Sequence, residues 1–253
     1  YIFIYFNLHL LYMKINVNEM RFYYLIYNNE RRKAHMISEF ADVSLKEINP
    51  VSRDNGIKKV QSGATGFMRM LSMGTLEQNR ELPFQPFALL EDDAKKYREF
   101  PEELQIPDDT DLLYIGLSRW GCLNGSNSSA GTYDAINCSE VSLYPSVCRV
   151  KNMFAMHGII ICSLTGLLSL QKCVMEDYYM KRGYDITLTK LQPFINTYAL
   201  RKPLVYQYGK VGGHERDTKF EINDEYIKEP EDYQDDMSTI SYKTTCLEIN
   251  RNT

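Results

Sequence analysis

Short hydrophobic runs alternate along the first half of the chain with segments of helical spacing. The aromatic and aliphatic run at residues 21–27 stops at two asparagines, which is typical of a buried strand. A charged segment follows at about residues 30–40, and it predicts a helix. Farther along, Phe67, Met70 and Leu71 recur at a spacing that places them on one buried face of a second helix.

The second half of the chain repeats this alternation. Ser163 suits the N-cap of a helix whose apolar positions recur as far as Val174. Residues 118–139 are rich in Gly, Ser and Asn and predict a long loop with a role in function or mobility. Further strands are expected at residues 86–90, 111–117, 154–161 and 204–207. Strands alternating with helices predict an α/β fold with a mainly parallel central sheet and helices on both faces.

Composition divides the chain into three segments. Residues 20–215 hold all of these elements and form one predicted domain. Residues 1–19 are a predicted N-terminal extension. Acidic residues crowd together after about Phe220, so residues 216–253 are expected to be a solvated arm or tail.

Charge and hydropathy narrow the classes of function. A net charge of −4 and a pI of about 5.7 argue against broad binding to nucleic acid. The apolar start at residues 1–12 is too short to span a membrane and has no basic region before it. No other segment approaches membrane-spanning length, so we expect a soluble, cytoplasmic protein with no transmembrane segment. None of the six cysteines forms a CxxC pair, which favours reduced thiols.

The sharpest chemical feature is the acidic triplet Glu91, Asp92 and Asp93, directly after the strand predicted at residues 86–90. In open α/β sheets, ligands bind beyond the carboxyl ends of the strands. Carboxylates there suit a Mg²⁺ or Mn²⁺ ion that bridges a diphosphate, because hard cations prefer oxygen ligands. The same acids would also stabilise the first turn of a helix beginning near Ala94. The spacing alone does not choose between these interpretations.

The triplet and its strand resemble glycosyltransferase family 25, in which a hydrophobic strand also ends in Glu-Asp-Asp. That family includes bacterial lipooligosaccharide sugar transferases and procollagen galactosyltransferases. The chain also resembles diverged sugar transferases of large DNA viruses of algae, which would place it in a host cytoplasm. Further stretches that resemble family motifs, in the same order, are Tyr24-Leu-Ile-Tyr-Asn-Asn-Glu-Arg-Arg32, Asp111-Leu-Leu-Tyr-Ile-Gly116, Gly158-Ile-Ile-Ile-Cys-Ser163, Tyr184-Asp185-Ile-Thr-Leu188 and Pro203-Leu-Val-Tyr-Gln207.

This resemblance implies a GT-A fold, which is a single Rossmann-like domain. It also implies an inverting transfer of a sugar from a nucleotide diphospho-sugar, in the first place a UDP-sugar, to a glycan hydroxyl. Tyr27, Arg31 and Arg32 would lie near the base and phosphates of the donor, where Arg binds phosphate in a bidentate manner. Asp185 matches the family's later "v-D" segment and would be the catalytic base, with Asp177 as the alternative. For either aspartate, a helix or turn cap is the competing structural role.

One segment departs from the family. Its usual Gly-Cys-x-x-Ser-His is replaced here by Gly63-Ala-Thr-Gly-Phe-Met-Arg69, so Arg69 is the candidate replacement for the lost donor contact. His214 follows two glycines that can approach a phosphate closely. In several GT-A enzymes a C-terminal histidine completes the metal site, here with Asp92 and Asp93, and a plain turn is the other interpretation. His157 lies in an apolar run, which is more typical of a core histidine than of a ligand.

Two other functions fit the same residues. A metal-dependent phosphoesterase or nuclease would use the acidic triplet as ligands, but it normally needs more scattered acids and two metals about 4 Å apart. A non-catalytic protein that binds glycan or nucleotide would keep the fold without the chemistry. Arginine or lysine replaces the metal in some GT-A enzymes, and Arg31, Arg32 and Arg69 leave that route open.

Overall fold

The computed structural model of the chain describes residues 12–52, 56–78, 82–121, 132–133, 136–181, 188–189, 191–213 and 216–228. Within these residues a nine-stranded sheet forms the centre of the molecule. Its strands, in the order in which they lie side by side, are β15 (Ile227–Lys228), β10 (Asn137–Glu140), β11 (Val147–Lys151), β13 (Thr197–Leu200), β7 (Leu112–Tyr114), β12 (Gly158–Ile161), β4 (Phe87–Glu91), β2 (Arg21–Leu25) and β3 (Ser44–Ile48).

Short two-stranded pairs and helices surround this sheet. The pairs are β1 (Tyr12–Asn16) with β6 (Glu103–Pro107), β5 (Ala94–Lys96) with β14 (Val205–Gln207), and β8 (Trp120–Gly121) with β9 (Thr132–Tyr133). The helices are α1 (Glu30–Glu39), α2 (Lys59–Leu76), α3 (Leu164–Met180), the short α5 (Gly209–Gly212) and the 3-10 turn η2 (Asp224–Tyr226).

The sheet is mixed, and its strand directions determine which ends meet. β3, β2 and β4 run parallel and form a Rossmann-like half. β12 runs antiparallel to both of its neighbours, β4 and β7. Four of the eight described pairings are parallel and four antiparallel. The predicted α/β class is therefore confirmed, and the amino end of β12 meets the carboxyl ends of β4 and β7.

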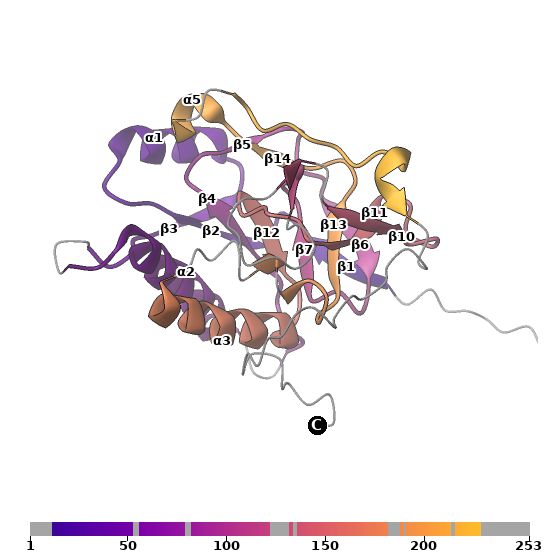
Figure 1. Cartoon of the computed structure of the whole chain (residues 1–253), viewed down its shortest axis with the longest axis horizontal. Coiled ribbons are helices and arrows are strands. Elements are labelled where there is room, and N and C mark those ends of the chain that lie inside the picture. Colours follow the sequence, from indigo (N-terminus) through magenta and orange to yellow (C-terminus); the bar gives the residue numbers. More distant parts are fainter. Residues whose placement is uncertain are drawn as a thin grey trace, which may run out of the picture.

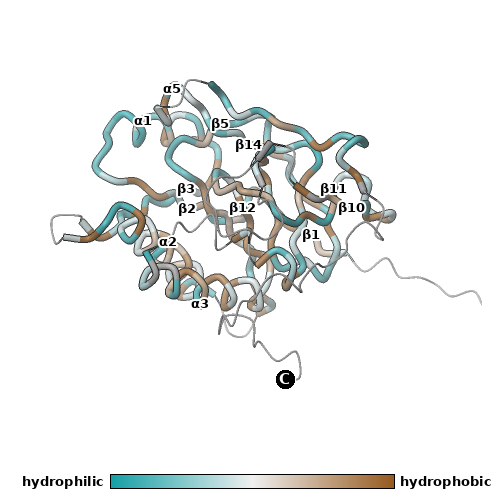
Figure 2. The backbone as a smooth tube through the Cα atoms, viewed as in Figure 1, coloured by the Kyte–Doolittle hydropathy of each residue, from teal (hydrophilic) through white to brown (hydrophobic). Residues whose placement is uncertain are grey.

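Helices cover both faces of the sheet, as predicted. α2 and α3 lie side by side on one face, and α1 lies on the other (Figure 1). Phe67 and Leu71 of α2 pack with Leu167 of α3 in the core beneath the first face. Met36 of α1 packs in the second core, which the β1–β6 pair also covers. Figure 2 shows hydrophobic residues concentrated along the central strands.

The chain after the acidic triplet is a strand, where one interpretation of the sequence placed a helix. β5 pairs antiparallel with β14, from Ala94 opposite Gln207 to Lys96 opposite Val205. The amide of Tyr208 also donates to the carbonyl of Asp93 at 2.8 Å. Because these main-chain hydrogen bonds already use the backbone after the triplet, the acids do not cap a helix there. The strand expected at residues 204–207 exists, but it lies in this pair and not in the central sheet.

Both predicted domain boundaries move outward in the described residues. β1 pairs with β6 over its whole length, and Ile15 and Val17 are buried in the core. At the other end, Phe220 and Ile222 are buried and β15 forms an edge of the central sheet. The described parts of the expected N-terminal extension and acidic arm therefore belong to the domain, because their apolar side chains contribute to its core.

Two further expectations concern thiols and membranes. Among the described residues, Cys138, Cys148, Cys162 and Cys173 are free and buried. Of the helices in the described ranges, none combines the length and the apolar character needed to cross a membrane.

Candidate functional site

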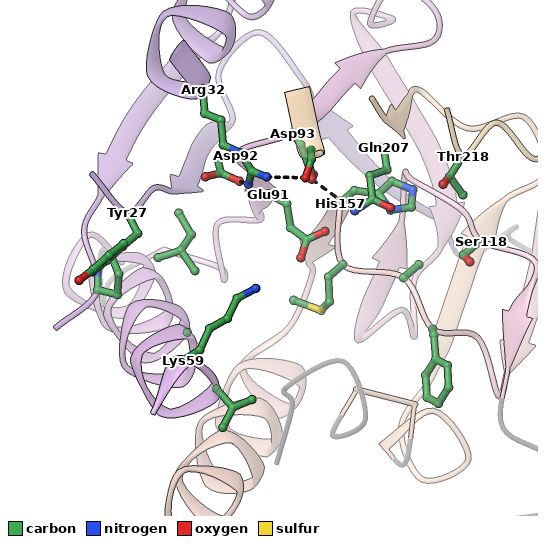
Figure 3. Close-up of a pocket in the computed structure, with 18 of the residues that line it drawn as sticks. Tyr27, Arg32, Lys59, Glu91, Asp92, Asp93, Ser118, His157, Gln207 and Thr218 are labelled. Carbon is green, nitrogen blue, oxygen red and sulfur yellow. Dashed lines mark hydrogen bonds and ion pairs between the residues drawn. The ribbon is translucent and has the colours of Figure 1, made fainter. Parts of the chain in front are cut away.

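A cleft of about 650 Å³ opens at the sheet edge where β2, β4 and β7 end and β12 begins (Figure 3). The first turns of α1 and α2 contribute to its walls, as do Gln207 of β14 and Gly212 of α5. This edge is where open α/β sheets bind ligands, because strand ends and helix N-termini converge there. The acidic triplet Glu91, Asp92 and Asp93 lines the cleft, so the fold places the strongest sequence signal at the ligand-binding edge.

Arg32 is the cation that the structure brings to the triplet. Asn29 caps α1 by accepting a hydrogen bond from the Arg32 amide at 3.1 Å, which fixes the start of the helix. The Arg32 guanidinium forms an ion pair with Asp92. It also donates to the carbonyls of Val211 at 3.2 Å and Gly212 at 2.7 Å. Arg32 therefore joins the end of β4 to α5, although the residues are distant in sequence.

The two aspartates are shielded from solvent. The side chain of Asp92 is 16% exposed, and Asp93 as a residue is 4% exposed. Burial raises the pKa of the Asp92 carboxyl above its ordinary value, Arg32 opposes this, and the charge of Asp93 adds to it. The side-chain amide of Gln207 donates to Asp93 Oδ2 at 3.4 Å. Negative charge is thus concentrated next to one guanidinium in a site of reduced solvent access.

A second cation enters from α2. Lys59 is the first residue of this helix, and it extends into the cleft from the side of the helix (Figure 3). Ser62 and Gly63 of the same turns also line the cleft. A helix N-terminus favours anions, since its first amides have no partner within the helix and the helix dipole is positive there. We call Arg32, Lys59 and the triplet the charged wall.

The other side of the cleft carries no formal charge. Its residues come from the end of β7, from β8 and from the segment that leads into β12: Ser118, Trp120, Phe154, Met156 and His157. Trp120 is 38% exposed, and its carbonyl accepts from the amide of Phe154 at 2.9 Å, so these two residues are held together. We call this set the neutral wall, and Figure 3 shows Ser118 and His157 across the cleft from Arg32 and Lys59.

The predicted site residues divide into three groups. Tyr27, Arg32 and the acidic triplet all line the cleft. Arg31 instead donates to the carbonyl of Lys210 at 3.0 Å, and Arg69 donates to the carbonyl of Asn49 at 2.6 Å. Neither arginine lines the cleft. The predicted contact of Arg31 and Arg69 with the donor is therefore corrected, because each guanidinium donates to a main-chain carbonyl outside the cleft.

The remaining three predicted residues are not placed as side chains. Asp185 and His214 lie outside the described residues. Asp177 belongs to α3, but its side chain is not described. The backbone next to it is informative, since Gln61 in the first turn of α2 donates to the carbonyl of Tyr178 at 3.3 Å. The C-terminal part of α3 therefore lies beside the turn of α2 that lines the cleft.

Sequence reasoning missed several lining residues. Lys59 could not be assigned without knowing where α2 begins, and nothing in its neighbours marks that point. Gln207 was expected only as part of a strand. His157 was interpreted as a core histidine because apolar residues surround it, and the structure shows that it is both buried and part of the cleft.

The predicted metal site at Asp92, Asp93 and His214 stays a prediction. Asp92 is already paired with Arg32. Among the described residues, no group of three or more His, Cys, Asp or Glu side chains is arranged to hold a metal ion. The described carboxylates therefore do not fit a divalent cation without a further ligand, and Arg32 supplies positive charge at the same place.

Comparisons with known proteins add little. No family model matches the chain, and no curated protein does either, so the likeness to glycosyltransferase family 25 rests on its motifs. One solved structure, of CTP:phosphocholine cytidylyltransferase from Streptococcus pneumoniae, is similar over 76% of this chain and 75% of its own, with 8% identity and a TM-score of 0.36. A similarity of this size leaves fold and chemistry to be argued from the residues themselves.

Proposed function

We propose that this protein is an inverting glycosyltransferase that moves a sugar from a nucleotide diphospho-sugar to a hydroxyl of a glycan. The observation that carries the proposal is the Arg32–Asp92 ion pair beside buried Asp93, at the end of β4 and in a cleft with a neutral far wall. This arrangement supplies separate surroundings for a charged leaving group and for an uncharged sugar. A UDP-sugar is the first donor to test, following the family resemblance.

The charged wall suits the diphosphate of such a donor. In the transfer, the bond between the sugar C1 and the diphosphate oxygen breaks, and the electron pair stays with the nucleoside diphosphate. Arg32 offers a planar guanidinium to that developing charge, and Lys59 with the first turn of α2 adds a second positive end. Preorganised charge of this kind typically contributes about 10²–10³-fold in rate. Tyr27 and Leu25, at the end of β2, line the side of the cleft where the nucleoside would lie.

An inverting step also needs a base on the acceptor side. The acceptor oxygen attacks C1 from the face opposite the diphosphate, and its proton passes to a carboxylate. Asp185 remains the first candidate from the family resemblance. Asp177 is the second, and its position in α3, next to Tyr178 and hence to the start of α2, is compatible with access to the cleft.

Whether a divalent metal takes part is a separate question. The acidic triplet outnumbers Arg32 and Lys59 on the charged wall, so a diphosphate there needs either the remaining N–H groups of Arg32 or a bound metal ion. Nucleotide-sugar binding in EDTA and in Mn²⁺ separates the two cases. Equal binding in both supports the arginine route, whereas binding that requires Mn²⁺ supports the predicted set with His214.

A thermal-shift screen against nucleoside diphosphates and their sugars tests the donor class. A ligand present at 100 times its Kd adds about 2.7 kcal/mol to the free energy of unfolding, which is easily measured. The proposal predicts stabilisation by at least one nucleotide sugar, lost in Arg32→Met and kept in Arg31→Met. Stabilisation by no member of the panel contradicts it.

A further inference from the structure

His157 lies in the cleft, and packing in the core alone does not explain its position there. It directly precedes β12, lies 3% exposed, and lines the cleft on the neutral wall. Gln207, which donates to Asp93, also lines the cleft (Figure 3). A buried histidine that served only the core would be expected to satisfy both of its ring nitrogens, because a buried polar atom without a hydrogen bond destabilises the fold.

Two glycines make room for this histidine and its strand. A Cβ at Gly116 would lie 2.4 Å from the ring Cδ2 and 2.9 Å from Nε2 of His157. A Cβ at Gly158, the next residue along, would lie 2.4 Å from Cγ2 of Val205. Gly116 itself forms an isolated bridge with Val205, close to Gln207. The position of the His157 ring therefore depends on the absence of a side chain at Gly116, and the packing of β12 against Val205 of β14 depends on the absence of one at Gly158.

The protonation state follows from burial and from one main-chain contact. Burial lowers the pKa of the His157 imidazole to about 4, so the ring is neutral near pH 7. A hydrogen bond to the main chain of Leu117 acts in the opposite direction and favours the charged ring. A main-chain hydrogen bond that favours the charged ring has the ring N–H as its donor. Its acceptor is therefore the carbonyl oxygen.

The other ring nitrogen is left as an acceptor. Nε2 is buried and makes no hydrogen bond within the part of the chain that the structure describes. The nitrogen that donates to Leu117 is therefore Nδ1, and Nε2 carries the lone pair. A neutral acceptor does not attract a phosphate oxygen, which is itself an acceptor. It does attract a hydroxyl, which is the donor that sugars present in number.

We propose that His157 Nε2 accepts a hydrogen bond from a hydroxyl of the transferred sugar, and that Gln207 binds the same sugar. This inference rests on the proposed function and assigns the sugar subsite of the donor within it. The diphosphate occupies the charged wall, and the sugar lies against the neutral wall beside His157. Gln207, whose amide has both donor and acceptor atoms, then connects the subsite to Asp93.

Calorimetry on the full chain tests this assignment with two ligands, a nucleotide sugar that the wild type binds and the matching free nucleoside diphosphate. In His157→Phe the ring volume is kept and the acceptor is lost. Affinity for the nucleotide sugar is expected to fall at least about 10-fold, and affinity for the nucleoside diphosphate to stay within about 2-fold, since an unpaired hydroxyl in the complex costs roughly 1.4 kcal/mol or more. His157→Gln, which places an amide near the Nε2 position, is expected to recover part of the loss.

Ser169→Ala is the matched control. Ser169 is fully buried in α3, its hydroxyl makes no hydrogen bond within the described residues, and it does not line the cleft. Both affinities are expected to be unchanged in this variant. An equal loss for the two ligands in His157→Phe means a packing role and overturns the assignment, as does no loss for either.

Two further outcomes distinguish a failure of this inference from a failure of the proposed function. If the wild type binds no nucleotide sugar, the proposed function fails and this inference fails with it. If His157→Phe does not fold, ¹⁵N NMR of the wild-type imidazole replaces it. The Nε2 resonance is expected to move when the nucleotide sugar is added and to stay in place with the nucleoside diphosphate, and an unmoved resonance overturns the assignment.

Discussion

The charged wall of the cleft and the neutral wall differ in how their polar groups are satisfied. On the charged wall, Arg32 donates to Asp92 and to the carbonyls of Val211 and Gly212, which uses three of the five N–H groups of its guanidinium. On the neutral wall, His157 keeps one ring nitrogen without a hydrogen bond among the described residues. The first wall is organised by its own ion pair, whereas the second presents a neutral ring nitrogen that can accept a hydrogen bond.

This contrast suggests that the two walls bind different parts of the donor. Ion pairs with supporting main-chain hydrogen bonds hold charges in place before a ligand arrives, which is the condition for stabilising a leaving diphosphate. An uncharged wall that contains an aromatic residue, Trp120, and a neutral imidazole suits a sugar ring, which offers hydroxyl groups and apolar C–H faces. Each prediction below changes one wall and leaves the other as it is.

The largest effect is expected from the charged wall. Arg32→Met should lower kcat/KM for transfer by about 10²–10³-fold, because the leaving diphosphate loses a preorganised cation. Asp93→Asn or Asp92→Asn should lower it by at least about 10²-fold, because Asp92 holds the Arg32 guanidinium in place and either carboxylate would ligate a metal ion that bridges the diphosphate. Steady-state kinetics with circular dichroism to verify folding provides the measurement.

Arg31→Met is the control for that experiment, since Arg31 is adjacent in sequence and, among the described residues, its guanidinium donates to the carbonyl of Lys210 outside the cleft. It should keep activity within about 3-fold, as expected for an exposed group outside the cleft. Near-native rates in all of the charged-wall variants would mean that the diphosphate binds elsewhere.

The second effect concerns the free energy of unfolding as the pH falls, and it comes from His157 on the neutral wall. The pKa of His157 is about 4 in the folded protein, below the usual value of about 6.5 for an unfolded histidine. Between these values the unfolded chain binds a proton that the folded chain does not, so stability is present above pH 6.5 and is lost as the pH falls toward 4. By pH 5 the loss should be about 2 kcal/mol.

Urea unfolding at pH 7, 6 and 5 measures this contribution of His157 to the free energy of unfolding. His157→Phe, which lacks the imidazole, is the comparison. The free energy of unfolding of the wild type should fall more steeply by about 2 kcal/mol over that range. Parallel curves for the two proteins would show that the imidazole is not held neutral in the cleft.

A smaller effect is expected at the exposed cation of the charged wall. Lys59→Gln should weaken nucleotide-sugar binding by up to about 5-fold, since an exposed charge contributes at most about 1 kcal/mol. The effect should shrink as salt rises, because added ions screen exposed charges. Lys172→Gln, on the exposed side of α3, is the matched control, and an equal change in both variants would remove Lys59 from the site.

The smallest effect is expected for Arg69, which the family resemblance suggested as a donor contact. Its guanidinium donates to the carbonyl of Asn49, outside the cleft. Arg69→Gln should leave nucleotide-sugar affinity within about 2-fold by calorimetry. A 10-fold loss would extend the charged wall beyond the described cleft.

Continuous apolar runs predicted β2, β4, β7 and β12, because those segments are buried whatever their partners, and the charged segment at residues 30–40 predicted α1. The inner strands β11 and β13 were not predicted. The helix cap at Ser163 was also predicted, and its hydroxyl accepts from the amide of Gly166 at 3.0 Å. β5 was not predicted, since its two lysines do not mark a strand and only its pairing with β14 makes it one.

The residues of the site also differ in how far the sequence could predict them. The acidic triplet could be found because a strand end is visible in the sequence. The pairing of Arg32 with Asp92 could only be suspected, as it joins two turns that the fold brings together. His157 was assigned to the core because its neighbours are apolar. The feature that distinguishes it, the absence of a Cβ at Gly116 beside its ring, lies in the segment after β7.

The most direct test of the central claim is ³¹P NMR of a nucleotide sugar incubated with the protein and a mixture of simple glycosides. The account predicts slow release of nucleoside diphosphate, which is the product of cleavage between C1 and the diphosphate. It also predicts that Arg32→Met abolishes the release and that Arg31→Met does not. Formation of nucleoside monophosphate and sugar phosphate would instead mean cleavage within the diphosphate by a phosphoesterase, and it would contradict the account, as would an unchanged donor for every nucleotide sugar tried.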